Sequence, residues 1–288
     1  MEQDKLVGPV QRFAQTLLGR PVTDLDLPWA WGEYADEGIR FACFRTYEEL
    51  VELSVQLSYE RSRIGKPISS AQHILGCYHS AVRDLHALLA GLTAAQLNQA
   101  PGEKDWSLRH LLAHVLSTDL NFYVVVRYTL DGSRKGDHRP LVVPDEQWNA
   151  IAGIEDPELD VLFKGPADDL LGYQGRLRWR ILAEFAGMSE EELALPSRFW
   201  ESHDYPLRFR LHRIESHVRQ HTIHAEKILA ANGVPYDEIR QLVRMLHRGL
   251  AQAESALIGA EEVGADLVDE AARAIGARAS DIAARLQN

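Results

Sequence analysis

The sequence has few cysteines, no long hydrophobic run and a deficit of positive charge. Its two cysteines, Cys43 and Cys77, lack the CxxC spacing of redox and zinc motifs. We therefore expect free, buried thiols rather than a disulfide framework. No apolar run of about 18 residues marks a membrane span, and no basic segment followed by an apolar one marks a signal peptide. The expectation is a cytoplasmic protein without a membrane partner.

Positive charge is scarce along the whole chain. Lysine and arginine number 31 against 42 aspartates and glutamates, which gives a formal net charge of −11. Proteins that bind nucleic acids normally carry a basic surface, so this balance argues against DNA or RNA as a partner. The 288 residues are 45% hydrophobic and 25% charged. This composition is typical of a globular protein with one substantial core or two smaller ones.

Helical periodicity is strongest in the middle of the chain. Two capping pairs, Thr93 with Gln96 and Ser189 with Glu192, precede loops that lead into new helices. This repeat predicts two similar helical pairs, which together form a four-helix bundle. Apolar residues recur at helical spacing in four stretches, at about 69–89, 107–131, 167–185 and 206–231.

The flanking segments predict a division of the chain into three parts. Residues 1–66 predict an N-terminal extension of mixed or irregular structure, with a hairpin within 29–45. Residues 67–234 hold the predicted bundle, and its connection over 131–166 is long enough to cross to a non-adjacent helix or to form a lid. We expect one short helix near Trp148 within this connection. Residues 235–288 predict a C-terminal helical hairpin.

Histidines give the strongest chemical signal. His217, His221 and His224 are spaced by four and three residues, which places them on one strip of a helix. Two histidines four residues apart offer two imidazole nitrogens to one divalent metal ion. His114 lies at the margin of the apolar stripe of its own helix, so it would join them if the two helices are neighbours. Three imidazoles with an open fourth position are typical of a catalytic metal site.

The same residues carry a resemblance to a known family. Leu88-Leu-Ala-Gly-Leu-Thr-Ala-Ala-Gln-Leu, then Trp106-Ser-Leu-Arg-His-Leu-Leu-Ala-His114, then two histidines four apart, resemble the DinB/YfiT-like metalloenzymes over roughly residues 68–233. The resemblance implies an all-α, up-down-down-up four-helix bundle that often forms homodimers. It also implies His114, His217 and His221 as metal ligands. His224 stands where many relatives have glutamine, which leaves open a role as an additional ligand or a partner of the ligands, and leaves the pair 221/224 as an alternative to 217/221.

The resemblance implies a divalent metal ion, zinc or nickel, and a small-molecule substrate. Some relatives are S-transferases that use a low-molecular-weight thiol, so a metal-activated thiol or water attacking a small electrophile is the expected reaction. The alternative is a non-catalytic helical protein, metal-binding or stress-associated, that acts through a protein partner. Asp119, five residues after His114, is expected either to hydrogen-bond a ligand imidazole or to make a polar contact between helices.

Overall fold

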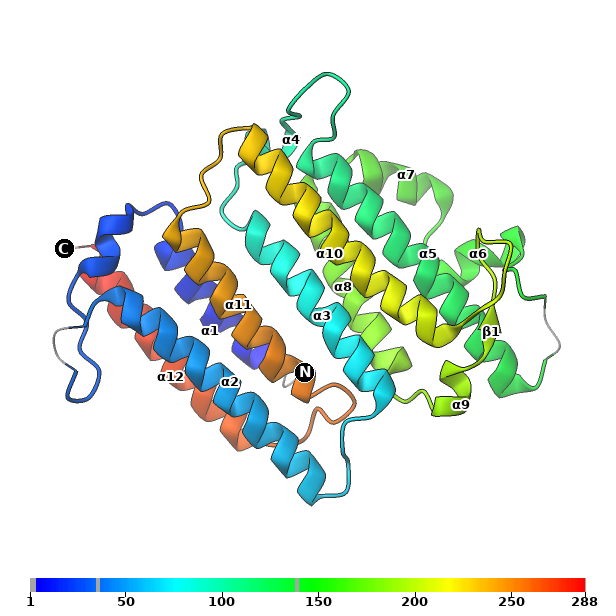
Figure 1. Ribbon diagram of the computed structural model, residues 1–288, viewed down its shortest axis with the longest axis horizontal. Helices are drawn as coiled ribbons and strands as arrows, with labels where there is room; N and C mark the ends of the chain where they lie inside the picture. The colour runs from blue at the N-terminus through cyan, green and yellow to red at the C-terminus, as the bar shows by residue number, and fades with distance from the viewer. Residues whose placement is uncertain (1–3, 35–36, 138–139, 288) are drawn as a thin grey trace. The chain divides into compact units, whose positions relative to one another are not determined.

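The computed structural model describes residues 4–34, 37–137 and 140–287 and is built from helices (Figure 1). Within these ranges, regular strand pairing is limited to two antiparallel segments, β1 (Pro196–Ser197) and β2 (Tyr205–Pro206). The prediction of an all-α fold is therefore confirmed. Every helix in the same ranges is too short or too polar to cross a membrane. The helices are α1 (Asp4–Leu17), the 3-10 helix η1 (Val22–Asp26), α2 (Ile39–Arg63), α3 (Ser70–Leu89), α4 (Ala94–Asn98), α5 (Leu108–Lys135), α6 (Asp145–Ala152), α7 (Asp156–Lys164), α8 (Ala167–Phe185), α9 (Glu190–Leu193), α10 (Leu207–Ala231), α11 (Glu238–Ala256) and α12 (Ala265–Arg285).

The chain forms two compact units, and helix α3 contributes residues to both. The first unit comprises the described residues of Met1–Ser69, Val82–Gly91 and Val234–Asn288. The second comprises those of Ser70–Ala81 and Leu92–Gly233. The three-part division of the chain at about residues 66 and 234 remains a prediction.

The first unit is built on α1, α2, α11 and α12, which lie side by side (Figure 1). Helix α2 packs along α11, and α1 packs along α12. Their apolar faces bury a continuous core that includes Phe13, Ile39, Leu50, Leu246 and Ile282. Each helix alone would leave its apolar stripe in water, so the pairing of these helices stabilises the unit.

Buried arginines bind polar groups inside the first unit. Arg83 donates to both carboxylate oxygens of Glu254, with 2.9 Å between its Nε and Oε2, and both side chains are buried. Arg61 donates from Nη1 to the carbonyl oxygens of Ala256 and Ile258, each at 2.9 Å. Because a buried charge is costly without partners, these contacts allow the two arginines to lie in the interior.

The expected hairpin within residues 29–45 is wrong, because α2 begins at Ile39. Ile39, Cys43 and Thr46 are buried at helical spacing, whereas the prediction followed a period of two through the same segment. The preceding loop does fold back on itself, with isolated antiparallel bridges from Pro28 to Gly38 and from Trp31 to Tyr34. The turn expected near residue 36 lies outside the described residues. Helices α1, η1 and α2 thus account for most of the described residues of the first 66 positions.

Both cysteines are free thiols. Cys43 is fully buried in the core of the first unit, and burial raises its pKa to about 12. Cys77, in the second unit, is only partly buried. A thiol that stays protonated is a poor nucleophile, so Cys43 serves as a small apolar core residue.

The second unit contains residues 70–81 of α3 together with α5, α8 and α10. Helix α5 packs against both α8 and α10. It runs parallel to α8, because Asp119 contacts Gln174 and, further along both helices, Arg127 contacts Glu184. Parallel neighbours require a crossover, and residues 136–166 provide it. The crossover therefore joins two helices in contact, rather than reaching a non-adjacent helix.

Helices α5 and α10 are antiparallel. His114, near the start of α5, meets His217 in the middle of α10, whereas Phe122 contacts Phe199, which precedes α10. Helix α3 also runs opposite to α5 (Figure 1). The order α3, α5, α8, α10 is therefore up-down-down-up, as predicted.

The connections follow the predicted capping chemistry. Thr93 with Gln96 and Ser189 with Glu192 each form the reciprocal hydrogen bonds of a capping box, at the starts of α4 and α9. Helix α5 extends beyond the expected stop at residues 131–132 and ends at Gly136, whose φ of 69° suits glycine. The crossover contains both α6, expected near Trp148, and α7, which was not expected.

Candidate metal centre

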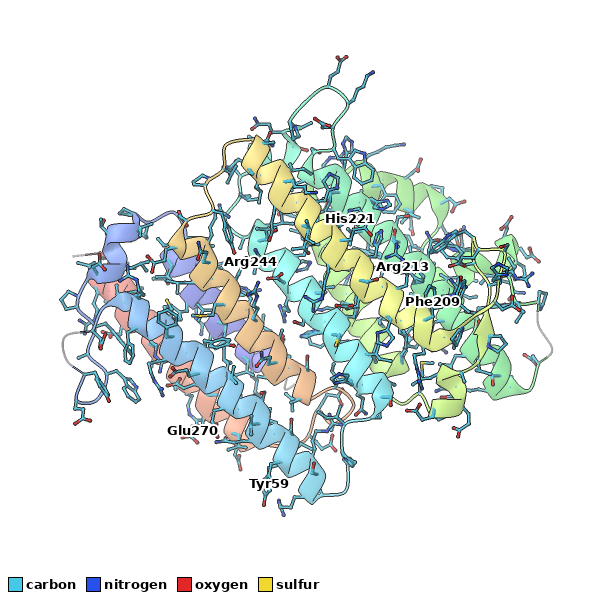
Figure 2. All side chains as sticks on the ribbon, viewed as in Figure 1. Tyr59, Phe209, Arg213, His221, Arg244 and Glu270 are labelled. Carbon is cyan, nitrogen blue, oxygen red and sulfur yellow. The ribbon has the colours of Figure 1, made fainter. Side chains whose placement is uncertain are left out.

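Helices α5 and α10 bring three imidazoles together. Ser107 accepts a hydrogen bond from the backbone N–H of His110, which fixes the start of α5 and sets His114 in its second turn. One ring nitrogen from each of His114, His217 and His221 lies within 4.8 Å of the others. The Nε2 atoms of His114 and His217 are 3.1 Å apart. Figure 2 shows His221 on α10.

The geometry and chemistry of the three imidazoles fit a divalent metal ion. Two nitrogens bound at 2.0–2.1 Å to one tetrahedral ion lie about 3.3 Å apart, close to the separation of the His114 and His217 Nε2 atoms. The Nδ1 atoms of His217 and His221 are buried and have no hydrogen-bond partner. A set of imidazole nitrogens suits zinc and nickel. The described residues add no fourth histidine, cysteine, aspartate or glutamate to the cluster, which leaves a coordination position for a small ligand.

Burial keeps the imidazoles neutral. Burial first, and then the neighbouring histidines and Arg213, lower the pKa of His217 to about 3 and that of His221 to about 4. Burial, followed by the charge of His224, also lowers the pKa of His114. Only a neutral imidazole has a lone pair for a metal ion, so these environments prepare the three side chains for binding at neutral pH.

Trp106 and His224 lie next to the three imidazoles. The indole of Trp106 stacks on the ring of His221, with 6.2 Å between centroids and 10° between planes, and it also contacts His114 at 5.0 Å. It remains 39% exposed, so it forms an outer wall of the site. The His224 ring contacts Trp106 at 5.7 Å and lies outside the converging group. His114 thus meets the 217/221 pair, and not the 221/224 pair.

Two roles were expected for Asp119, and the structure shows the second of them, a polar contact between helices. Its Oδ2 accepts hydrogen bonds from the Tyr78 hydroxyl and from Nε2 of Gln174, each at 3.1 Å, and its Oδ1 has no hydrogen-bond partner. The carboxyl is fully buried, and burial raises its pKa to about 7 although both hydrogen bonds oppose this change. Asp119 therefore joins α3, α5 and α8, and it hydrogen-bonds no imidazole of the described residues.

Arg213 is a neighbour of the site that the sequence reasoning missed. It precedes His217 by four residues on α10 and is partly buried. Its charge contributes to the lowered pKa of both His217 and His221. The signal that could have identified it is the continuation of the four-residue spacing from 221 through 217 to 213.

Comparison with known proteins gives the family. A family model described as the DinB superfamily matches residues 78–225, which include all three clustered histidines. Neither the curated proteins nor the solved structures gave a significant match. The matched segment covers all of α5 and α8 and most of α10, and it spans just over half of the chain. The chain therefore belongs to the DinB superfamily.

Proposed function

We propose that this chain is a metal-dependent enzyme in which His114, His217 and His221 hold a divalent ion, zinc or nickel. The proposed reaction transfers an activated thiol or water to a small electrophile. The observation that carries the proposal is the convergence of three imidazoles from two helices, two of them buried and that of His114 partly buried, with no fourth protein ligand among the described residues. An open position is typical of catalytic metal sites, whereas structural sites are closed by protein ligands.

The proposed chemistry depends on a divalent ion that would act as a Lewis acid and on a site that is partly enclosed from solvent. A divalent ion held by these imidazoles would lower the pKa of a thiol or water beside it, so that the nucleophile exists near neutral pH. The packing of α5 on α10 fixes the three rings relative to one another, and Trp106 limits the access of solvent from one side. In the thiol reaction, the S–H proton passes to solvent, a carbon–sulfur bond forms, and the leaving group departs with the electrons of its bond to carbon.

A low-molecular-weight thiol is the proposed co-substrate because thiolate is a soft ligand that binds zinc and nickel well. The proposal includes a homodimer, which sedimentation analysis of the purified protein would test. The assignment of the metal ligands needs neither the thiol co-substrate nor the homodimer, so each of the two is tested separately.

Elemental analysis of purified variants tests the ligands. We expect about one divalent ion per chain in the wild type and loss of most bound metal in His114→Ala, His217→Ala and His221→Ala, because each removes a ligand from an open three-ligand site. His212→Ala is the matched control, since His212 lies on the same helix and is exposed. His224→Ala is also expected to retain its metal.

Full metal occupancy in all three ligand variants would refute the assignment. Catalysis is tested by incubating metal-loaded protein with low-molecular-weight thiols and a panel of small electrophiles, with His217→Ala as the inactive comparison. Metal-loaded protein that binds its ion but transfers no thiol and hydrolyses none of the electrophiles would refute the catalytic proposal and favour a non-catalytic metal-binding protein.

A further inference from the structure

Arg213 continues the line of metal-site residues along α10. Residues 213, 217 and 221 are spaced by four, so their side chains emerge from the same face of the helix. Figure 2 shows Arg213 and His221 along this helix. Side chains four residues apart on one helix are neighbours, so Arg213 lies beside His217 on this face.

Arg213 differs from the other arginines of α10 in its partners. Arg208, Arg210 and Arg219 form ion pairs with Glu190, Glu201 and Glu215, respectively. Among the described residues, the contact of the Arg213 guanidinium is a 3.3 Å hydrogen bond from Nη1 to the Ser216 hydroxyl, and no carboxylate pairs with it. A guanidinium presents five donors, so most of the binding capacity of Arg213 is not used by the described residues.

The charges around the site favour an anionic ligand. Imidazole binds metal in its neutral form, and no carboxylate of the described residues joins the cluster, so a bound divalent ion would keep its full positive charge. Arg213 adds a further positive charge, and the two cations repel each other. Glu215, two residues after Arg213 on α10, is already paired with Arg219. A ligand that carries negative charge to both cations would relieve this repulsion.

We infer that Arg213 binds the carboxylate of the thiol or substrate whose other end occupies the metal site, and that it selects anionic over neutral ligands. The inference rests on the proposed function, because it assumes that a ligand occupies the open position. A planar guanidinium matches a carboxylate through two parallel hydrogen bonds, which a lysine ammonium cannot reproduce. Arg213 is therefore a positioning residue rather than a catalytic one.

The spacing along α10 sets the size of a suitable probe. Arg213 and His217 are four residues apart, which is about 6 Å along the helix axis. A thiol and a carboxylate separated by two methylene groups span a comparable distance, so 3-mercaptopropionate is the probe and its neutral methyl ester is the matched comparison. Cobalt(II) replaces the native metal, because cobalt–thiolate ligation produces a near-ultraviolet absorption band that reports thiol binding without catalysis.

We expect the cobalt-loaded wild type to bind 3-mercaptopropionate about 10-fold more tightly than the ester, since hydrogen bonds to charged groups contribute about this factor or more. In Arg213→Gln, the preference should fall to nearly one-fold, and Arg213→Lys should restore part of it. Arg219→Gln, which makes the same change of charge on the same helix, should keep the wild-type preference. Cobalt content and circular dichroism confirm that each variant is folded and loaded.

An unchanged preference in Arg213→Gln would overturn the inference and leave the proposed function intact. Absence of cobalt binding, or of a cobalt–thiolate band with either probe in the wild type, would instead remove the proposed function and with it the inference. A preference lost equally in Arg219→Gln would also overturn it, because the effect would then come from the general charge of α10 rather than from Arg213.

Discussion

Asp119 carries a carboxyl group in the interior of the second unit, where its side chain is fully buried. Its Oδ2 accepts hydrogen bonds from Tyr78 and Gln174, but no cationic side chain of the described residues forms an ion pair with the carboxyl group. A buried carboxylate without such compensation is unfavourable, so the protonated form is stabilised and the pKa rises to about 7. The side chain therefore titrates near neutral pH, far above its ordinary value of 3.8.

This pKa predicts that the second unit loses stability as pH rises. The folded state holds the Asp119 proton up to about pH 7, whereas the unfolded state releases it near pH 3.8. The folded state thus binds more protons between these values, and the free energy of unfolding decreases as pH rises through this window. At about 1.4 kcal/mol per pH unit, we expect Asp119 to contribute a loss of at most about 3 kcal/mol between pH 5 and pH 8.

Urea unfolding of metal-free wild type and Asp119→Asn at both pH values measures this contribution. The variant lacks the ionisable group, so its stability relative to wild type should increase from pH 5 to pH 8. Identical pH dependence in the two proteins would show that Asp119 does not titrate in the folded state.

At the scale of single residues, the sequence predicted side chains that share a helix better than those that meet across helices. The spacing of His217, His221 and His224 places all three on one strip, but it does not show which pair His114 reaches. Which pair faces His114 depends on how α10 is rotated about its axis relative to α5, and this rotation is set by tertiary packing rather than by local sequence. Arg213 was missed because its significance lies in the lack of a carboxylate partner, and a sequence does not reveal partners.

At the scale of elements, the packing of α11 against α2 depends on one close approach between the two helices. Gly249 of α11 faces α2, where an added Cβ would lie 3.1 Å from Cδ2 of Tyr47 and 3.2 Å from Cβ of Leu50. Both distances are shorter than ordinary van der Waals contact. The absence of a side chain at Gly249 therefore allows α2 and α11 to pack closely along their lengths.

We expect Gly249→Leu to destabilise the first unit by about 1–3 kcal/mol, the usual cost of overpacking a filled interior. Gly276→Leu on α12 is the control, because the nearest atom to its added Cβ is the end of the flexible Arg12 side chain, at 3.5 Å. Thermal unfolding followed by circular dichroism compares the two. Equal stability of both variants would indicate that α2 moves away without cost.

Element boundaries were predictable where capping residues define them. Ser107 and the two capping boxes gave the starts of α5, α4 and α9, and the apolar stripes gave α3, α8 and α10. Two features escaped prediction. The start of α2 was assigned to a strand because aromatic and polar residues happen to alternate there, and α7 is a short, exposed helix whose apolar pattern is weak.

At the scale of the whole molecule, helical periodicity identified buried faces but not their partners. The pairing of α1 with α12 and of α2 with α11 joins segments from opposite ends of the chain. Nothing local encodes such pairing, so the sequence suggested an N-terminal extension and a separate C-terminal hairpin. The buried pair of Arg83 and Glu254 adds a further long-range contact within this unit, between α3 and α11.

We expect Arg83→Leu to destabilise the first unit by about 3–5 kcal/mol, because it removes the bidentate cation from a fully buried carboxylate. The double variant Arg83→Leu/Glu254→Leu should recover most of this loss, since two apolar side chains replace the pair without leaving a charge behind. Denaturant unfolding of the single and double variants forms the test. A double variant no more stable than Arg83→Leu would contradict the proposed origin of the loss.

The discontinuous first unit also constrains the order of events on the ribosome. Residues 1–69 emerge first, but α1 and α2 remain without their packing partners until residues 234–288 have been synthesised. All of the second unit emerges in between, together with residues 82–91 of the first unit, so the bundle of the second unit can close while translation continues. The apolar faces of α1 and α2 are consequently exposed for most of the synthesis of the chain, and this is the period in which chaperones would engage the nascent protein.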